Sequence, residues 1–143
     1  MTHFRFSLSF GCFVAFLGGT LEISATDSPQ IRLSIDGIDY RFEGALERVA
    51  AERFHDLAVA ALHSYPEDAA WREIGLDGTS YRGMFESSTH SRLEFEFWSP
   101  AVGTPPHRLA RAALEAVPLD HPDERFEYSL KTLRKDLGIS WVP

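Results

Sequence analysis

The chain has 143 residues, of which 44% are hydrophobic and 24% are charged, and its formal net charge is −7. This length is typical of one domain with a buried core, and the composition is that of an ordinary globular protein rather than a disordered or membrane chain. The acidic charge disfavours nucleic acid and anionic membrane surfaces as partners, and it favours a basic protein partner.

Residues 1–25 carry the three parts of an export signal. A short basic start precedes an apolar run over residues 6–17, and the segment closes on the small residues Ser24 and Ala25. The run is shorter than the roughly 20 residues that a membrane-spanning helix needs. The basic residues are nearly all arginine, which is typical of GC-rich bacterial genomes. We therefore expect a periplasmic or secreted product that begins near Thr26.

The same residues also fit a second interpretation. Apolar and polar residues alternate from Phe4 to Phe10, as they do along a half-buried strand. A turn at Gly18-Gly19 would then close a hairpin. In this interpretation the first 25 residues are strands of the domain, and the protein is a cytoplasmic interaction subunit.

Cofactor chemistry has little support in the sequence. Cys12 is the single cysteine and lies inside the predicted signal, so the remaining residues form no disulfide, thiolate metal site or thiol nucleophile. The histidines follow no metal-ligand spacing, and the chain has no glycine-rich phosphate loop or dinucleotide fingerprint. We expect no cofactor and no metal ion.

Residues 31–42 predict a tight β-hairpin with one apolar face. Asp36-Gly37 is typical of a two-residue turn, and such a turn places Leu33 opposite Tyr40. The other face is polar, as in an antiparallel sheet with one side exposed to water.

Helical patterns occupy three further segments. Residues 45–64 have apolar positions at helical spacing, with His55 on the solvated side. A second helix begins at Thr104-Pro105 with a capping hydroxyl and ends at Pro118. Residues 126–137 predict a third helix, and a strand over residues 126–130 is the alternative.

Four more strands complete the prediction. Residues 71–76 and 79–86 flank a turn at Asp77-Gly78, and residues 92–98 form the clearest strand. The strands over residues 79–86 and 92–98 pair with Arg82 opposite Glu96, Glu86 opposite Arg92 and Phe85 opposite Leu93. Residues 139–142 would add an edge strand.

Together these elements predict an α+β fold: an antiparallel sheet of four to six strands with two or three helices packed on one face. The domain comprises residues 26–143, or the whole chain if the first 25 residues are strands. A strand at residues 126–130 would make the order βαββαβ, a ferredoxin-like arrangement with an added hairpin strand.

The outward face of the clearest strand is the predicted functional surface. Glu94 and Glu96 lie about 7 Å apart there, a separation at which two carboxylates act as acid and base or bind a cation. On a solvated sheet face they are expected to pair with Arg82 and Arg92 instead. Trp98 shares this face, and tryptophan is a frequent binding hot spot. We predict that these five residues bind a partner and that none is catalytic.

The sequence thus favours a small exported protein that binds another protein, as an inhibitor or immunity protein does, through the polar face or an edge of its sheet. The alternative is a small hydrolase or isomerase in which Glu94, Glu96 and a histidine share a pocket.

Overall fold

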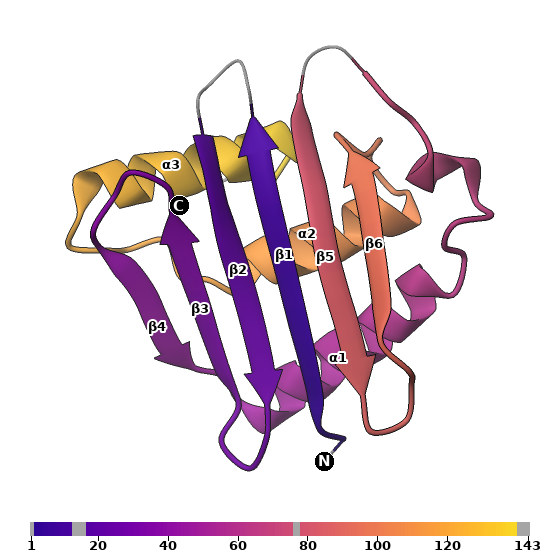
Figure 1. Ribbon diagram of the computed structural model, residues 1–143. Coiled ribbons are helices and arrows are strands. Elements are labelled where there is room, and N and C mark those ends of the chain that lie inside the picture. Colours follow the sequence, from indigo (N-terminus) through magenta and orange to yellow (C-terminus); the bar gives the residue numbers. More distant parts are fainter. Residues whose placement is uncertain (1, 13–16, 76–77, 140–143) are drawn as a thin grey trace.

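The computed structural model describes residues 2–12, 17–75 and 78–139. Within them, one antiparallel sheet is covered on one face by helices (Figure 1). The strands are β1 (Phe4–Cys12), β2 (Leu17–Ala25), β3 (Gln30–Ile35), β4 (Arg41–Ala45), β5 (Thr79–Ser87) and β6 (Leu93–Trp98). The helices are α1 (Arg48–Leu62), α2 (Pro105–Glu115), α3 (Glu124–Asp136) and the 3₁₀ turn η1 (Ala69–Trp71).

The predicted fold class is confirmed: the sheet has six strands, and three α-helices lie on one of its faces. Among the described residues, no helix combines the length and the apolar character that crossing a bilayer requires. Asp77 of the predicted turn and residues 140–142 of the predicted last strand lie outside the described residues.

The strands lie in the order β4-β3-β2-β1-β5-β6, and every neighbouring pair is antiparallel. The first four strands form a meander, after which α1 passes behind the sheet and β5 returns beside β1 (Figure 1). Strands β1 and β2 therefore lie at the centre of the sheet, and β4 and β6 form its two edges.

Residues 1–25 supply these two central strands, as the second interpretation of the N-terminus predicts. Pairing runs without interruption from Phe4 opposite Ala25 to Cys12 opposite Leu17. The predicted turn at Gly18-Gly19 is wrong, because both glycines lie inside β2. Cleavage after Ala25 stays a prediction about the product in the cell, and it would remove both central strands.

The core lies between the sheet and the helices. Alternate residues of β1 are buried, because a strand directs successive side chains to opposite faces. Aromatic rings supply much of its volume: Phe6 packs edge-on against Phe54 of α1 at 4.8 Å between ring centroids, and Tyr81 stacks on Phe97 at 4.7 Å. Helices α1 and α2 present small side chains to the core. These buried alanines are Ala51, Ala58, Ala61, Ala110 and Ala113.

The predicted hairpin over residues 31–42 has the correct faces and the wrong register. Leu33 lies opposite Phe42 rather than Tyr40. Tyr40 instead precedes the strand, and its hydroxyl forms a 3.0 Å hydrogen bond with Nδ1 of His121. The register differs by two residues, so each strand residue keeps its predicted face.

The first helix differs from the prediction at its start and on its buried side. α1 begins at Arg48, because Ala45 is the last residue of β4. His55 is buried rather than solvated, and its ring packs against Phe4 at 5.4 Å and Phe85 at 5.6 Å. Contact with rings from two strands therefore sets the orientation of this helix.

The predicted strand over residues 71–76 is wrong for residues 71–75, and residue 76 lies outside the described residues. Ala69–Trp71 form η1, which Asp68 begins by accepting a hydrogen bond from a backbone N–H of the turn at 2.9 Å. The Trp71 ring packs edge-on against Phe97 at 5.5 Å. This segment therefore packs beside β6 instead of pairing within the sheet.

Residues 126–137 form a helix, so the alternative strand is wrong. The Asp123 carboxylate accepts a 2.9 Å hydrogen bond from the Phe126 N–H at the start of α3, and Gly138 follows its end with a φ of +71°. The ferredoxin-like order required a strand at residues 126–130, but these residues belong to α3, so the chain does not have that order.

Helix α2 begins at Pro105, as predicted. The Thr104 hydroxyl, however, donates to Ala101 O at 2.6 Å and so closes the preceding turn instead of capping the helix. Nε2 of the buried His107 donates to Leu137 O at 2.7 Å. This bond ties the first turn of α2 to the end of α3.

Arg134 of α3 holds the other end of α2. Its buried guanidinium donates to Leu114 O at 2.9 Å and to Val117 O at 2.6 Å, and burial lowers its pKa from the ordinary value. We expect Arg134→Met to lower the free energy of unfolding by about 2 kcal/mol, since it leaves two carbonyls without their charged donor. In urea melts, Arg111→Met on the exposed face of α2 is the control. It loses only an exposed pair with Glu115 and should change stability by less than about 0.5 kcal/mol. Equal losses of stability from the two variants would contradict the role of Arg134 in holding α2.

Candidate functional site

The face of the sheet opposite the helices is polar. Its central strands carry small hydroxyl side chains together with Arg5 and Glu22, and the outer strands carry further charged side chains. One row across the sheet runs from Ser34 through Thr20, Ser9 and Arg82 to Glu96, as the strand registers place them. The hydroxyl oxygens of Ser9 and Thr20 lie 3.2 Å apart. Among the described residues no helix lies over this face (Figure 1). It is therefore accessible to a partner.

The predicted charged residues on this face pair with one another. Arg82 Nη2 lies 3.6 Å from Glu96 Oε2 across β5 and β6, which confirms that pair. Arg92 Nη2 lies 3.0 Å from Glu94 Oε1, as expected if the two glutamates pair with Arg82 and Arg92. Glu86, predicted opposite Arg92, instead has its Oε1 3.6 Å from Arg5 Nη1. Exposed pairs of this kind are worth at most about 1 kcal/mol. They position charge on the surface and contribute little to stability.

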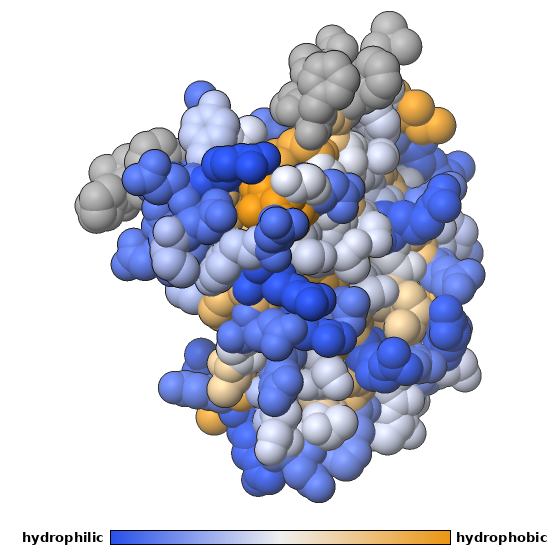
Figure 2. Space-filling model, turned by 60° about the vertical axis from the view of Figure 1, so that its left-hand side comes forward, coloured by the Kyte–Doolittle hydropathy of each residue, from blue (hydrophilic) through white to orange (hydrophobic). Residues whose placement is uncertain are grey.

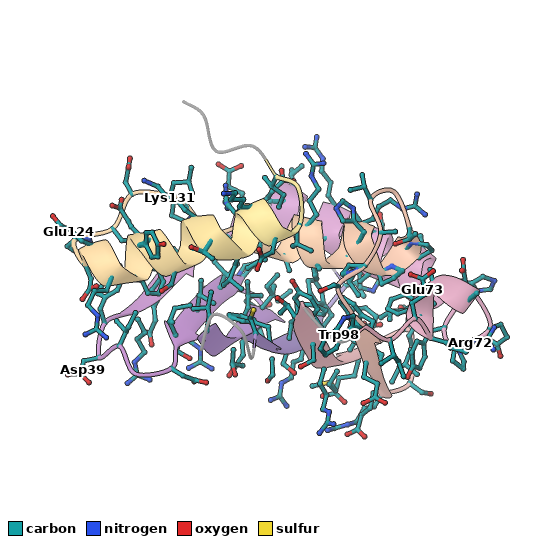
Figure 3. All side chains as sticks on the ribbon, turned by 90° about the horizontal axis from the view of Figure 1, so that it is seen from above. Asp39, Arg72, Glu73, Trp98, Glu124 and Lys131 are labelled. Carbon is teal, nitrogen blue, oxygen red and sulfur yellow. The ribbon has the colours of Figure 1, made fainter. Side chains whose placement is uncertain are left out.

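A groove of about 620 Å³ lies where β6 ends. Strands β1, β5 and β6 contribute one side, and the segment from Tyr65 to Ile74 contributes the other. Figure 3 labels Trp98 at the end of β6 and Arg72 and Glu73 on this segment. The groove thus combines aromatic, apolar and charged groups from distant parts of the chain. We call it the Trp98 groove.

Trp98 is half-buried against the start of β5. A Cβ atom at Gly78 would lie 3.3 Å from Trp98 Nε1 and 2.0 Å from Ser99 Oγ, and Gly78 has a φ of +124°. Only glycine permits this close approach and this backbone conformation together. Ser99 Oγ also accepts a 2.7 Å hydrogen bond from the Thr79 N–H. The indole therefore lies against a well-defined part of the sheet.

Ile74 forms the exposed part of the groove wall. Its side chain is 89% exposed, which is rare for a large aliphatic residue and is a feature of interaction surfaces when other apolar groups adjoin it. The sequence pattern does not predict Ile74, Tyr65 or Arg72 as site residues, because residues 71–76 resemble a strand. Pro66 and Asp68 are residues that favour turns, and they are the sequence signal for an irregular segment here.

The structure brings together three of the five predicted binding residues. Arg82, Glu96 and Trp98 line the Trp98 groove. Glu94, near the start of β6, and Arg92, which precedes that strand, pair with each other outside the groove. The predicted surface is therefore one strand face with the groove at one end.

A carboxylate–histidine site lacks geometric support. Among the described residues, no histidine lines the Trp98 groove, and no three His, Cys, Asp or Glu side chains are placed to hold a metal ion. His90 Nδ1 does lie 3.5 Å from Ser87 Oγ in the loop after β5. That oxygen, however, accepts hydrogen bonds from the N–H groups of Thr89 and His90 at 3.2 and 3.0 Å. The serine thus closes a turn.

Two further features of the structure are a second hollow and a pair of buried hydroxyl groups. A hollow of about 590 Å³ lies between α3 and the adjoining ends of β2 and β3. Figure 2 brings the β4 side of the molecule forward and shows hydrophobic areas among hydrophilic side chains. On the helix-covered side of the sheet, the hydroxyls of Thr79 and Tyr81 are buried. Burial raises the pKa of Tyr81 and that of Asp136 above their ordinary values.

No protein-family model, no curated protein and no solved structure matches this chain.

Proposed function

We propose that the protein binds another protein by pairing an extended segment of its partner with the outer edge of β6, beside the Trp98 groove. The observation that carries this proposal is an edge strand with outward-directed backbone groups next to a groove lined by aromatic and apolar side chains. Adding a strand to a sheet edge is a recurrent mode of peptide recognition. Inhibitors and immunity proteins are the classes of small binding protein to which we assign the chain.

The backbone of β6 supports this mode. The Ser99 N–H donates to Thr79 O at 2.8 Å, so these two residues form a hydrogen-bonded pair of the β5–β6 ladder. In an antiparallel ladder such pairs recur at every second residue. Phe97 therefore directs its N–H and C=O to β5, whereas Glu94 and Glu96 direct theirs to the outer edge. Within the described residues, no hydrogen bond to these outward groups occurs.

Side-chain charges indicate the kind of segment that fits. A strand added at this edge would place its own outward side chains beside Glu94 and Glu96, which lie on the open face. The chain carries a net charge of −7. Opposite charges on adjacent strands stabilise pairing, and complementary net charge speeds encounter. The favoured partner segment therefore carries lysine or arginine at alternate positions.

The groove adds an apolar contact to this backbone pairing. Ile74 is largely exposed and lines the groove together with Tyr65 and Trp98. Fully burying an isoleucine side chain contributes about 1.5–3 kcal/mol, so one apolar residue of the partner can anchor here. Ile74 makes this contribution without supporting the core of the unbound protein.

A photo-crosslinking amino acid placed at position 74 is expected to capture the partner in cells of the source organism. The matched control position is Val49, which is 57% exposed on α1 and does not line the groove. Ile74→Asp should weaken the captured complex by roughly tenfold or more, which corresponds to about 1.4 kcal/mol. Val49→Asp should leave its affinity unchanged. Equal capture at both positions, or equal loss of affinity, would contradict the proposal.

A further inference from the structure

We propose that two copies of the chain associate through β4, so that their sheets join edge to edge about a twofold axis. This interface lies at the opposite edge of the sheet from β6 and does not depend on the proposed function. The argument rests on the backbone directions of β4, on the charges that alternate along it, and on the row of charges it would extend.

The backbone groups at the outer edge of β4 are directed away from the sheet. The Leu46 N–H donates to Pro29 O at 2.9 Å and continues the β3–β4 register by one residue pair. Since hydrogen-bonded pairs recur at every second residue, Arg41, Glu43 and Ala45 direct their N–H and C=O groups outward. No hydrogen bond to these groups occurs among the described residues, so β4 can accept another strand.

The charges on β4 select one register for a second copy. Hydrogen-bonded pairs across the new interface must join outward-directed residues. One such register places Arg41 opposite Glu43 of the second copy, and symmetry repeats this pair. The neighbouring registers place Glu43 opposite Glu43 or Arg41 opposite Arg41. Opposite charges at facing positions stabilise a strand pair and like charges destabilise it. The strand is therefore complementary to itself in a single antiparallel register.

The same pairing continues a row of alternating charge across the open face. Glu43 lies opposite Arg32, which lies opposite Glu22. Arg32 Nη2 is 2.7 Å from Glu22 Oε2. Within the described residues, neither Arg41 nor Glu43 forms an ion pair. Arg41 of a second copy would stand beside Glu43 and complete the sequence of positive, negative, positive and negative side chains.

Charged side chains on an edge strand ordinarily prevent association. On β6 the charged side chains oppose pairing with a second β6, because Glu94 and Glu96, its two outward charged residues, carry the same sign. On β4 the two charges have opposite signs and lie two residues apart, which is the spacing that an antiparallel twofold pair brings together. The geometry thus favours a closed dimer through β4 over association of two β6 edges.

The test exchanges the two charges. Sedimentation equilibrium of the full chain over a wide concentration range is expected to show a monomer–dimer equilibrium. Arg41→Glu or Glu43→Arg alone should weaken it at least tenfold, because each places two like-charged pairs at the interface. The double variant R41E/E43R should restore dimerisation to within a few-fold of the native protein.

Mixing the two single variants provides the sharpest measurement. Every facing pair is then opposite in charge between unlike chains, so native mass spectrometry should detect the heterodimer in excess of either homodimer. Thermal unfolding of each variant controls for folding. The proposal is overturned if the native chain is monomeric throughout or forms larger assemblies. It is also overturned if folded single variants dimerise as tightly as the native chain, or if the mixture shows no preference for the heterodimer.

Discussion

A chain that begins at Thr26 is expected to remain unfolded under conditions in which the full chain folds. Removing residues 1–25 deletes β1 and β2, and β1 is the strand that joins β5 to the rest of the sheet. Phe6 and Leu8 are among the largest fully buried side chains. Each buried side chain of this size contributes about 1.5–3 kcal/mol. The β1 side chains alone are thus comparable with the roughly 5–15 kcal/mol that stabilises a typical domain.

Far-UV circular dichroism and amide chemical-shift dispersion check this expectation, with the full chain refolded from urea as the control. The intact mass of the protein from its natural source then tests cleavage directly. A full-length species of 16.1 kDa means that both strands are retained. A folded product that begins near Thr26 would contradict the sheet described above and would favour export with processing.

Phe95→Ala is expected to lower the free energy of unfolding by about 3–5 kcal/mol, the usual cost of truncating a buried aromatic side chain. Phe95 is 2% exposed, and its ring lies 6.2 Å from those of both Phe6 and Trp71. The substitution therefore leaves a cavity between the sheet and the segment before β5. Urea melts of the purified variant measure the loss.

The neighbouring residue is the control for this prediction. The Glu94 side chain is 73% exposed, and within the described residues its ion pair is with exposed Arg92. Glu94→Ala should change stability by less than about 0.5 kcal/mol, as expected for a surface substitution away from special features. Similar losses from both variants would mean that the two faces of β6 are assigned incorrectly, and the proposed binding edge would be wrong with them.

The two proposed interfaces use opposite edges of one sheet. A partner segment on β6 leaves β4 accessible, and a second copy on β4 leaves the Trp98 groove accessible. A dimer would then present two grooves at its outer ends, and a partner with two suitable segments would gain avidity without any new contact. The charge exchanges on β4 and the crosslinking at Ile74 therefore fail or succeed independently.

Local patterns were sufficient where neighbouring segments of the chain pair with each other. The β5–β6 hairpin has its predicted register, with Arg82 opposite Glu96 and Phe85 opposite Leu93. Only a short loop joins its strands, so their alternation and charges specify the pairing without reference to the rest of the fold. The third helix is similar, because the spacing of Phe126 and the residues after it follows a helical period.

The N-terminus shows where local patterns are ambiguous. An apolar run that follows a basic start is the same signal whether it is exported or buried. On one side β1 pairs with β5, where Phe6 lies opposite Phe85, a residue nearly eighty positions later in the chain. This distant pairing is what makes Phe4–Cys12 a central strand. Likewise, His55 is buried by rings from β1 and β5, and no periodicity within α1 contains that information.

The candidate site depends on local sequence patterns and on the tertiary structure. Sequence alternation alone determined that Arg82, Glu96 and Trp98 share the outward face of adjacent strands, because side-chain direction in a strand depends only on parity. Only the tertiary structure placed Ile74 and Tyr65 beside them, since an irregular segment takes its path from the surfaces it packs against. It alone also decided that β4 and β6 are edges, because strand order depends on pairings between segments distant in the chain.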